Sequence, residues 1–215
     1  MRTRRNTSTR TSSLGGKTAA LGFALFALSG CLQAPGDPAQ REVTVSRSAV
    51  TIAGPSGFCV DPATLRDEEE SAFVLLGNCA AIARSSRQPQ PEVRALLTAA
   101  VQELEAVSIR DQGSQVAEFL KTEEGRALLS RTGDATSVGI LNARKSGDVL
   151  YLHAYDKSPG YVPGMASEQW RAMFDLDGAI ISLTVLGFED EPLSADTGMA
   201  TVREFASIIR RENAR

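Results

Sequence analysis

The chain has 215 residues, of which 42% are hydrophobic and 23% are charged, and its formal net charge at pH 7 is −3. That length suits one domain, or one domain with a small elaboration. An acidic balance repels nucleic acid and anionic membrane surfaces, so neither is an expected partner of the folded part.

The first thirty residues have the pattern of a secretory signal peptide. Residues 1–17 carry five basic residues and no acidic residue, and residues 18–29 form an apolar run. Such a run spans about 18 Å as a helix, which is too short for a bilayer core of about 30 Å. A basic segment before a short apolar run is typical of a signal that is removed after export.

A four-residue motif closes this apolar run. Residues 28–31 are Leu-Ser-Gly-Cys, which resembles the lipobox of bacterial lipoproteins at all four positions. The resemblance implies cleavage before Cys31, a diacylglycerol on its thiol and a further acyl chain on its amino group. Two acyl chains would hold the protein at a membrane, and Leu32 rather than Asp at the next position favours the outer membrane. The alternative is an ordinary signal peptide with an incidental cysteine.

We therefore expect a signal peptide over residues 1–30, a flexible tether over 31–41 and a single α+β domain over 42–215. The tether is rich in Pro, Gly and Gln and cannot bury a core. Removal of the signal leaves 18 basic and 26 acidic residues, which is a net charge of −8.

Two cysteines remain besides Cys31. In an oxidising compartment Cys59 and Cys79 are expected to form a disulfide. The alternative is two buried free thiols. A metal site is less expected, because no second Cys or His lies near either thiol in the sequence.

The first half of the domain has strand patterns. Apolar residues alternate over 43–52, and short apolar runs at 58–60 and 73–76 predict two more strands. The segment 92–107 is ambiguous, because its apolar residues fit helical spacing while 95–101 also fits a strand. Two short helices follow, one starting near Ser114 and one capped by Thr122 and ending at Gly133.

The second half predicts a meander and a closing helix. Residues 138–143 and 149–155 flank a turn at 145–148, as in a hairpin. A segment at 170–174 and a turn at 175–178 lead into a long strand over 179–188. A helix is expected from about Ser194 to Glu212, with an apolar stripe on one face and Arg210 and Arg211 at its negative end.

An antiparallel sheet backed by helices is the economical arrangement of these elements, which places the chain in the α+β class. Residues 54–61 (GPSGFCVD), 122–129 (TEEGRALL) and 170–178 (WRAMFDLDG) resemble patterns shared by uncharacterised bacterial envelope lipoproteins. The order of elements is also similar to the PsbP-like fold, whose members are mostly accessory or assembly factors. That resemblance favours a strand at 95–101.

His153 is the sole histidine, so a catalytic triad or a two-histidine metal site would have to use it or do without. Strand alternation puts it on one face with Tyr151 and Tyr155, and Trp170 lies on the next predicted segment. A binding patch formed by these four residues is the functional interpretation. The alternatives are an ordinary polar strand face for His153 and a core position between the hairpin and the closing helix for Trp170.

The sequence thus predicts a lipid-anchored protein that faces the periplasm and binds an envelope protein or a small ligand without catalysis. We expect no cofactor, no metal and no nucleic-acid partner. The alternative is an envelope hydrolase with a site around His153.

Overall fold

The computed structural model describes residues 39–45, 49–103, 107–158 and 163–214. The predicted signal peptide, the lipobox with Cys31 and most of the tether lie outside the described residues. Contacts divide the chain into two units, 1–34 and 35–215, and the fold described below belongs to the second.

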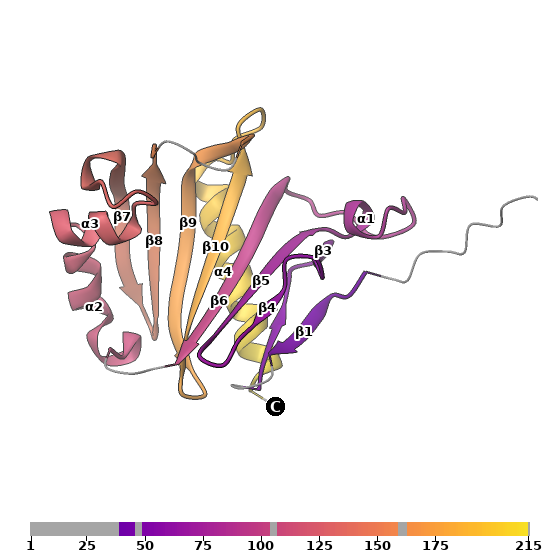
Figure 1. The fold of residues 1–215 in the computed structure, drawn as a ribbon, viewed down its shortest axis with the longest axis horizontal. Helices are drawn as coiled ribbons and strands as arrows, with labels where there is room; N and C mark the ends of the chain where they lie inside the picture. The colour runs from indigo at the N-terminus through magenta and orange to yellow at the C-terminus, as the bar shows by residue number, and fades with distance from the viewer. Residues whose placement is uncertain (1–38, 46–48, 104–106, 159–162, 215) are drawn as a thin grey trace, which may run out of the picture. The chain divides into compact units, whose positions relative to one another are not determined.

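Among the described residues, eight strands form one antiparallel sheet with the order β3-β5-β6-β10-β9-β8-β7, and β4 pairs with β5 beside this path (Figure 1). Neighbouring strands are hydrogen-bonded, and their register places, for example, Val101 of β6 opposite Ile181 of β10. The strands are β3 (Phe58–Val60), β4 (Arg66–Asp67), β5 (Ser71–Asn78), β6 (Ala95–Glu103), β7 (Val138–Ser146), β8 (Val149–Asp156), β9 (Met165–Leu176) and β10 (Ala179–Phe188).

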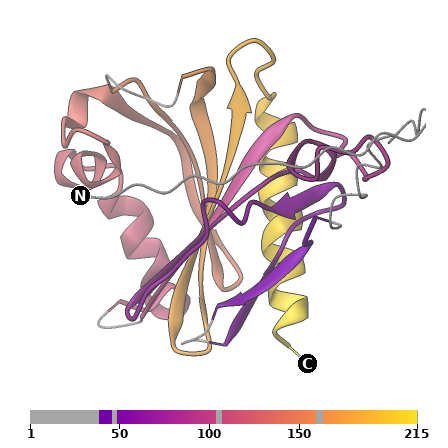
Figure 2. The same ribbon diagram turned by 45° about the vertical axis from the view of Figure 1, so that its right-hand side comes forward.

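The closing helix α4 (Ala195–Glu212) packs on one face of the sheet, against β9 and β10 (Figure 1). A separate two-stranded sheet, β1 (Glu42–Val45) and β2 (Val50–Ala53), lies beside α4 on the same side (Figure 2). The Asn213 side chain fastens the end of the helix to this sheet. Its Oδ1 accepts from the Thr51 amide at 2.8 Å and its Nδ2 donates to the Thr51 carbonyl at 2.8 Å.

The opposite face is covered only in part. Helix α2 (Ile109–Phe119) packs on β7, β8 and β9, and α3 (Glu123–Leu129) packs on β7. The short 3₁₀ helix η1 (Ala135–Ser137) joins α3 to β7. Helix α1 (Cys79–Ile82) lies near the opposite edge of the sheet, next to β3 and β5. The Ile82 and Leu96 side chains both lie near Gly77, within 3.7 Å of the place that a Cβ on this glycine would take.

Two apolar clusters result, one on each face. The larger lies between the sheet, α4 and the β1-β2 sheet, and it includes Trp170, Phe174 and Phe205. The smaller lies under α2 and includes Ile109, Leu150 and Leu152. Because alternate residues of a strand face opposite sides, β8 and β9 contribute to both clusters.

The predicted α+β class, the antiparallel sheet and the closing helix are confirmed. Segment 95–101 is a strand, as the adopted prediction has it: it pairs with β5 on one side and β10 on the other, and its alternate residues are buried in the larger apolar cluster. Some predicted bounds were wrong. Helix α2 begins at Ile109 rather than near Ser114, α3 ends at Leu129 before Gly133, and β9 extends well beyond 170–174.

Candidate functional site

The predicted patch of Tyr151, His153, Tyr155 and Trp170 lies on β8 and β9. His153 faces Trp170 directly across the strand pair, and their rings stack with centroids 4.8 Å apart and planes 17° apart. The His153 Nε2 lies 2.9 Å from a carboxylate oxygen of Glu168. The Arg203 guanidinium of α4 lies over the Tyr151 ring, 5.0 Å from its centroid.

Trp170 is a core residue. Its side chain is 1% exposed, and a Cβ added to Gly198 of α4 would overlap the indole ring. The indole is therefore packed between His153 and the helix backbone. Its buried Nε1 has no hydrogen-bond partner within the described part of the chain. The structure thus places Trp170 away from the surface, in agreement with the core alternative, and it cannot form part of an exposed patch.

Tyr155 packs against the strand next to it. A Cβ on Gly139, its partner on β7, would overlap the Tyr155 ring. Tyr151, His153 and Tyr155 line none of five of the best-formed pockets around the described residues. The hydrolase alternative requires a pocket beside His153, and none of these five supplies one.

A different group of polar side chains lines a cavity on the sheet face opposite α4. We call it the polar trough. Its volume is about 280 Å³, and Leu129 and Leu186 supply its apolar wall. The polar residues that line it are Thr98, Arg131, Asp156, Gln169, Arg171 and Thr184.

The register of β6, β9 and β10 brings polar residues of the polar trough side by side. Arg171 of β9 is the cross-strand partner of Thr184 on β10, and Thr184 is the partner of Thr98 on β6. Directly paired residues of an antiparallel sheet project from the same face, so the three side chains form one row across three central strands. Alternation along β9 explains why the row is polar, since Trp170 and its even-numbered neighbours fill the core under α4 while Gln169 and Arg171 face the other way.

Gln169 and Arg171 are held together by two hydrogen bonds. Arg171 donates from Nε at 3.2 Å and from Nη2 at 2.9 Å, both to Oε1 of Gln169. These bonds fix the plane of the guanidinium and turn the amide nitrogen of Gln169 away from it. Gln169 is 4% exposed and Thr184 is 9% exposed, whereas Thr98 and Arg171 are half-buried.

Asp156 closes one end of the trough and is satisfied by its own neighbours. Its carboxylate accepts from the Ser158 amide at 2.8 Å, from the Ser137 hydroxyl at 3.3 Å and from the Arg131 amide at 3.3 Å. Burial favours the neutral acid, but the hydrogen bonds from Ser158, Arg131 and Ser137 outweigh it and lower the pKa of Asp156. The carboxylate is therefore charged at neutral pH.

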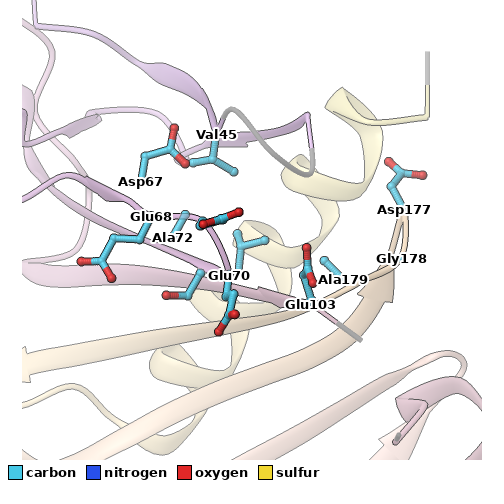
Figure 3. Close-up of a pocket in the computed structure, with 12 residues that line it drawn as sticks. Val45, Asp67, Glu68, Glu70, Ala72, Glu103, Asp177, Gly178 and Ala179 are labelled. Atoms are coloured by element: carbon cyan, nitrogen blue, oxygen red, sulfur yellow. The ribbon is translucent and has the colours of Figure 1, made fainter. Parts of the chain in front are cut away.

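A second hollow, of about 210 Å³, is surrounded by acidic side chains (Figure 3). Asp67 ends β4, Glu68 and Glu70 lie between β4 and β5, Glu103 ends β6, and Asp177 lies in the turn between β9 and β10. Nevertheless, no group of three or more His, Cys, Asp or Glu side chains in the described ranges could hold a metal ion. Acidic side chains alone do not define a ligand, so this hollow is not treated as a site.

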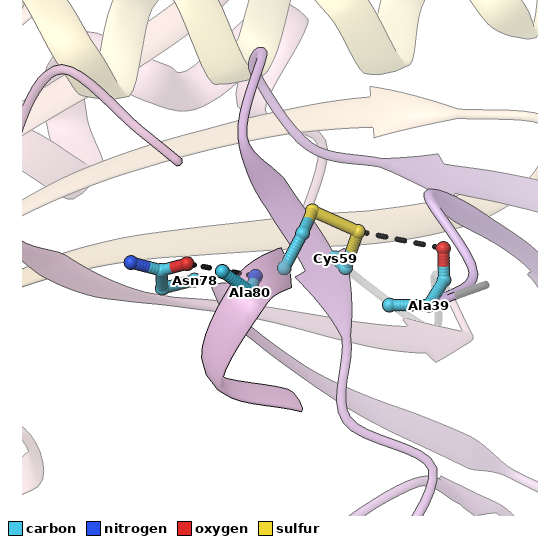
Figure 4. Close-up of a disulfide and its surroundings, with 5 residues drawn as sticks. Ala39, Cys59, Asn78 and Ala80 are labelled. Atoms are coloured by element: carbon cyan, nitrogen blue, oxygen red, sulfur yellow. Dashed lines mark hydrogen bonds between the residues drawn. A yellow bond between two sulfur atoms is a disulfide. The ribbon is translucent and has the colours of Figure 1, made fainter. Parts of the chain in front are cut away.

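The predicted disulfide is present. Cys59 of β3 is bonded to Cys79, the first residue of α1, across a sequence separation of 20 (Figure 4). Both cysteines are buried. Asn78 caps α1 next to the bond, its side chain accepting from the Ala80 amide at 2.8 Å (Figure 4).

In the described ranges, no helix has the length and apolar character needed to cross a membrane.

Comparison with known protein families and with curated proteins finds no match for this chain. The functional argument therefore depends on the residues themselves. Sequence reasoning missed the polar trough, because it concentrated on the aromatic residues of β8 and β9. A signal was present: Gln169 and Arg171 alternate with Trp170 and Ala172, which is unusual for a strand covered on both faces.

Proposed function

We propose that this chain is a lipid-anchored protein of the bacterial cell envelope, attached through Cys31, whose folded domain binds a ligand or an envelope protein without catalysis. The Leu-Ser-Gly-Cys motif at 28–31 carries the proposal. The Cys59–Cys79 disulfide supports it independently, because stable disulfides belong to exported proteins.

The polar trough supports a binding role. It is a hollow of about 280 Å³ in which six polar side chains converge beside two leucines, and convergent polar groups in a pocket can fix the orientation of a small ligand. The proposal also includes the resemblance to envelope lipoproteins and to accessory proteins of the PsbP-like fold.

The anchor is tested by fractionating bacteria that express the full chain and that are fed an alkyne-bearing fatty acid. We expect label on the wild-type protein and its recovery with the outer membrane. Cys31→Ala should lose the label and leave the membrane fraction. Leu32→Asp is the matched variant, which should keep the label and move to the inner membrane. A Cys31→Ala protein that remains labelled would contradict the proposal.

A further inference from the structure

Helix α1 and the segment that follows it carry positive charge near one edge of the sheet (Figure 1). We call residues 79–91 the α1 loop. It contains Arg84 and Arg87 and no acidic residue, whereas the chain from Cys31 onward has a net charge of −8. Both arginines are exposed, and within the described ranges neither forms an ion pair with a carboxylate. The α1 loop is therefore a local basic surface on an acidic domain.

The backbone holds Arg84 in a conformation that favours glycine. The Arg84 amide donates to the Ala81 carbonyl at 3.2 Å and the Ser85 amide donates to the Ala80 carbonyl at 3.0 Å, which is the Schellman ending of a helix. This ending needs a left-handed residue before Ser85, and Arg84 has a φ of 49°. Glycine adopts that conformation without the steric cost that a side chain brings. An arginine at such a strained position points to a role other than folding.

The α1 loop begins beside the place where the chain enters the fold. The Cys59 sulfur lies 3.5 Å from the Ala39 carbonyl oxygen and is bonded to Cys79, the first residue of α1 (Figure 4). Fully extended, the chain from Cys31 to Ala39 spans at most about 29 Å. A lipid group on Cys31 would therefore keep the disulfide and the start of the α1 loop close to the membrane.

We propose that the α1 loop docks on the phospholipid headgroups of the membrane that holds the anchor, with Arg84 and Arg87 contacting headgroup phosphates. Guanidinium groups bind phosphates through paired hydrogen bonds, and an anionic lipid surface attracts basic residues beside it. This attraction falls off within a Debye length of about 8 Å, so the local charge decides it rather than the net charge of the domain. The inference rests on the anchor proposed above and names the surface that meets the membrane.

Photo-crosslinking to lipid headgroups tests this docking. The protein is purified from the membrane fraction of cells that express the full chain, and it is reconstituted into vesicles of phosphatidylcholine and phosphatidylglycerol. Part of the phosphatidylglycerol carries a photoreactive headgroup, and a digest that spares arginine locates the label by mass spectrometry. We expect about fivefold more label on the α1 loop than on the rest of residues 42–214. This excess should disappear in 1 M salt, where the Debye length is about 3 Å.

Three substitutions separate charge from folding. Arg84→Gly removes one charge and places glycine where the left-handed backbone favours it, so this variant should keep or raise the melting temperature. Combined with Arg87→Gln, it should lower the label on the α1 loop by about fivefold or more. Arg144→Gln is the control and should leave the label unchanged, because Arg144 is exposed on β7 at the opposite edge of the sheet.

The docking is overturned if the α1 loop is labelled no more than the rest of the domain, or if the folded double variant is labelled like the wild type. Label concentrated on another surface would place the membrane contact there and leave the two arginines to a different partner. A protein that does not stay with the vesicles lacks the anchor, which contradicts the proposed function as well. An anchored protein without excess label on the α1 loop contradicts the docking alone.

Discussion

Asp175 shows how one side chain joins two elements. It lies near the end of β9, and its carboxylate accepts from the amides of Ile109 and Arg110 at 2.9 and 3.0 Å and from the Ser108 hydroxyl at 2.7 Å. A carboxylate at the amino end of a helix satisfies unpaired amides and meets the positive end of the helix dipole. Helix α2 begins at Ile109 because Ser108 caps it locally, its hydroxyl accepting from the Asp111 amide at 3.2 Å, and because Asp175, distant in sequence, pairs with the first two amides. The Ser108 cap is a local signal, whereas the contribution of Asp175 depends on the fold.

We expect Asp175→Asn to lower the free energy of unfolding by about 1–2 kcal/mol at pH 7. Burial raises the pKa of Asp175, but hydrogen bonds from Ser108, Arg110 and Ile109 outweigh it and lower the pKa overall. The stabilisation is thus present above the unfolded pKa of about 4 and is lost as the pH falls through the lower folded value.

Denaturant unfolding of the two proteins between pH 7 and pH 3 measures this difference, which should shrink below about pH 4. Asp177→Asn is the matched control, since Asp177 is exposed and its positive φ of 49° suits Asn. A difference that grows as the pH falls would contradict the assignment.

Gly198 of α4 lies directly against the buried indole of Trp170. Gly198→Ala should destabilise the protein by about 1–3 kcal/mol, because the new methyl group overlaps the buried indole and the gain in helix propensity is only about 1 kcal/mol. Gly77→Ala is the control, since its Cβ would lie 3.6 Å from the nearest side-chain atom, Cδ1 of Ile82. Thermal unfolding compares the two. Equal stability of Gly198→Ala and the wild type would show that the indole is not packed on the helix.

At the scale of elements, the sequence predicts best where a pattern is local. Helix α4 was predicted from Ser194 to Glu212 and spans Ala195–Glu212 with Ser194 as its cap. Segment 92–107 has apolar residues that fit both a helix and a strand, and the choice depends on pairing with β5 and β10, which are distant in sequence. The row of Thr98, Arg171 and Thr184 depends on the same register, so it could not be predicted from a single strand.

The disulfide joins β3 to the start of α1, and we expect it to stabilise the domain by about 3 kcal/mol, from the size of the loop that it closes. The variant Cys59→Ala/Cys79→Ala should lose that amount in denaturant unfolding. Addition of a reductant should lower the stability of the wild type towards that of the variant and leave the variant unchanged. Two free thiols in the protein isolated from cells would contradict the pairing.

At the scale of the whole domain, the sheet is covered unequally. Helix α4 and the β1-β2 sheet cover one face, where the large apolar cluster lies. On the other face α2 and α3 cover the side near β7 and β8, and the polar trough lies where β6, β9 and β10 carry polar residues instead. The sequence predicts an antiparallel sheet backed by helices. The position of the polar trough depends on which part of the second face α2 and α3 leave uncovered, and the sequence does not predict that.

The aromatic residues of β8 and β9 contact neighbouring strands of the same sheet. Strand alternation explains why Tyr151, His153 and Tyr155 share a face. On that face His153 stacks on Trp170 and Tyr155 packs over Gly139. A lone histidine and a tryptophan draw attention in a sequence because they are rare. Trp170 is here a core residue, and the half-buried His153 stacks on it and pairs with Glu168, whereas the less conspicuous Gln169 and Thr184 line a cavity.

We propose that lipid on Cys31 holds the protein in the envelope. The mass of the N-terminal peptide of the protein extracted from cells tests this attachment. We expect a peptide that begins at Cys31 and carries a diacylglyceryl group on the thiol and an acyl chain on the amino group. A peptide that begins at an unmodified Cys31, or a chain that still contains residues 1–30, would contradict it.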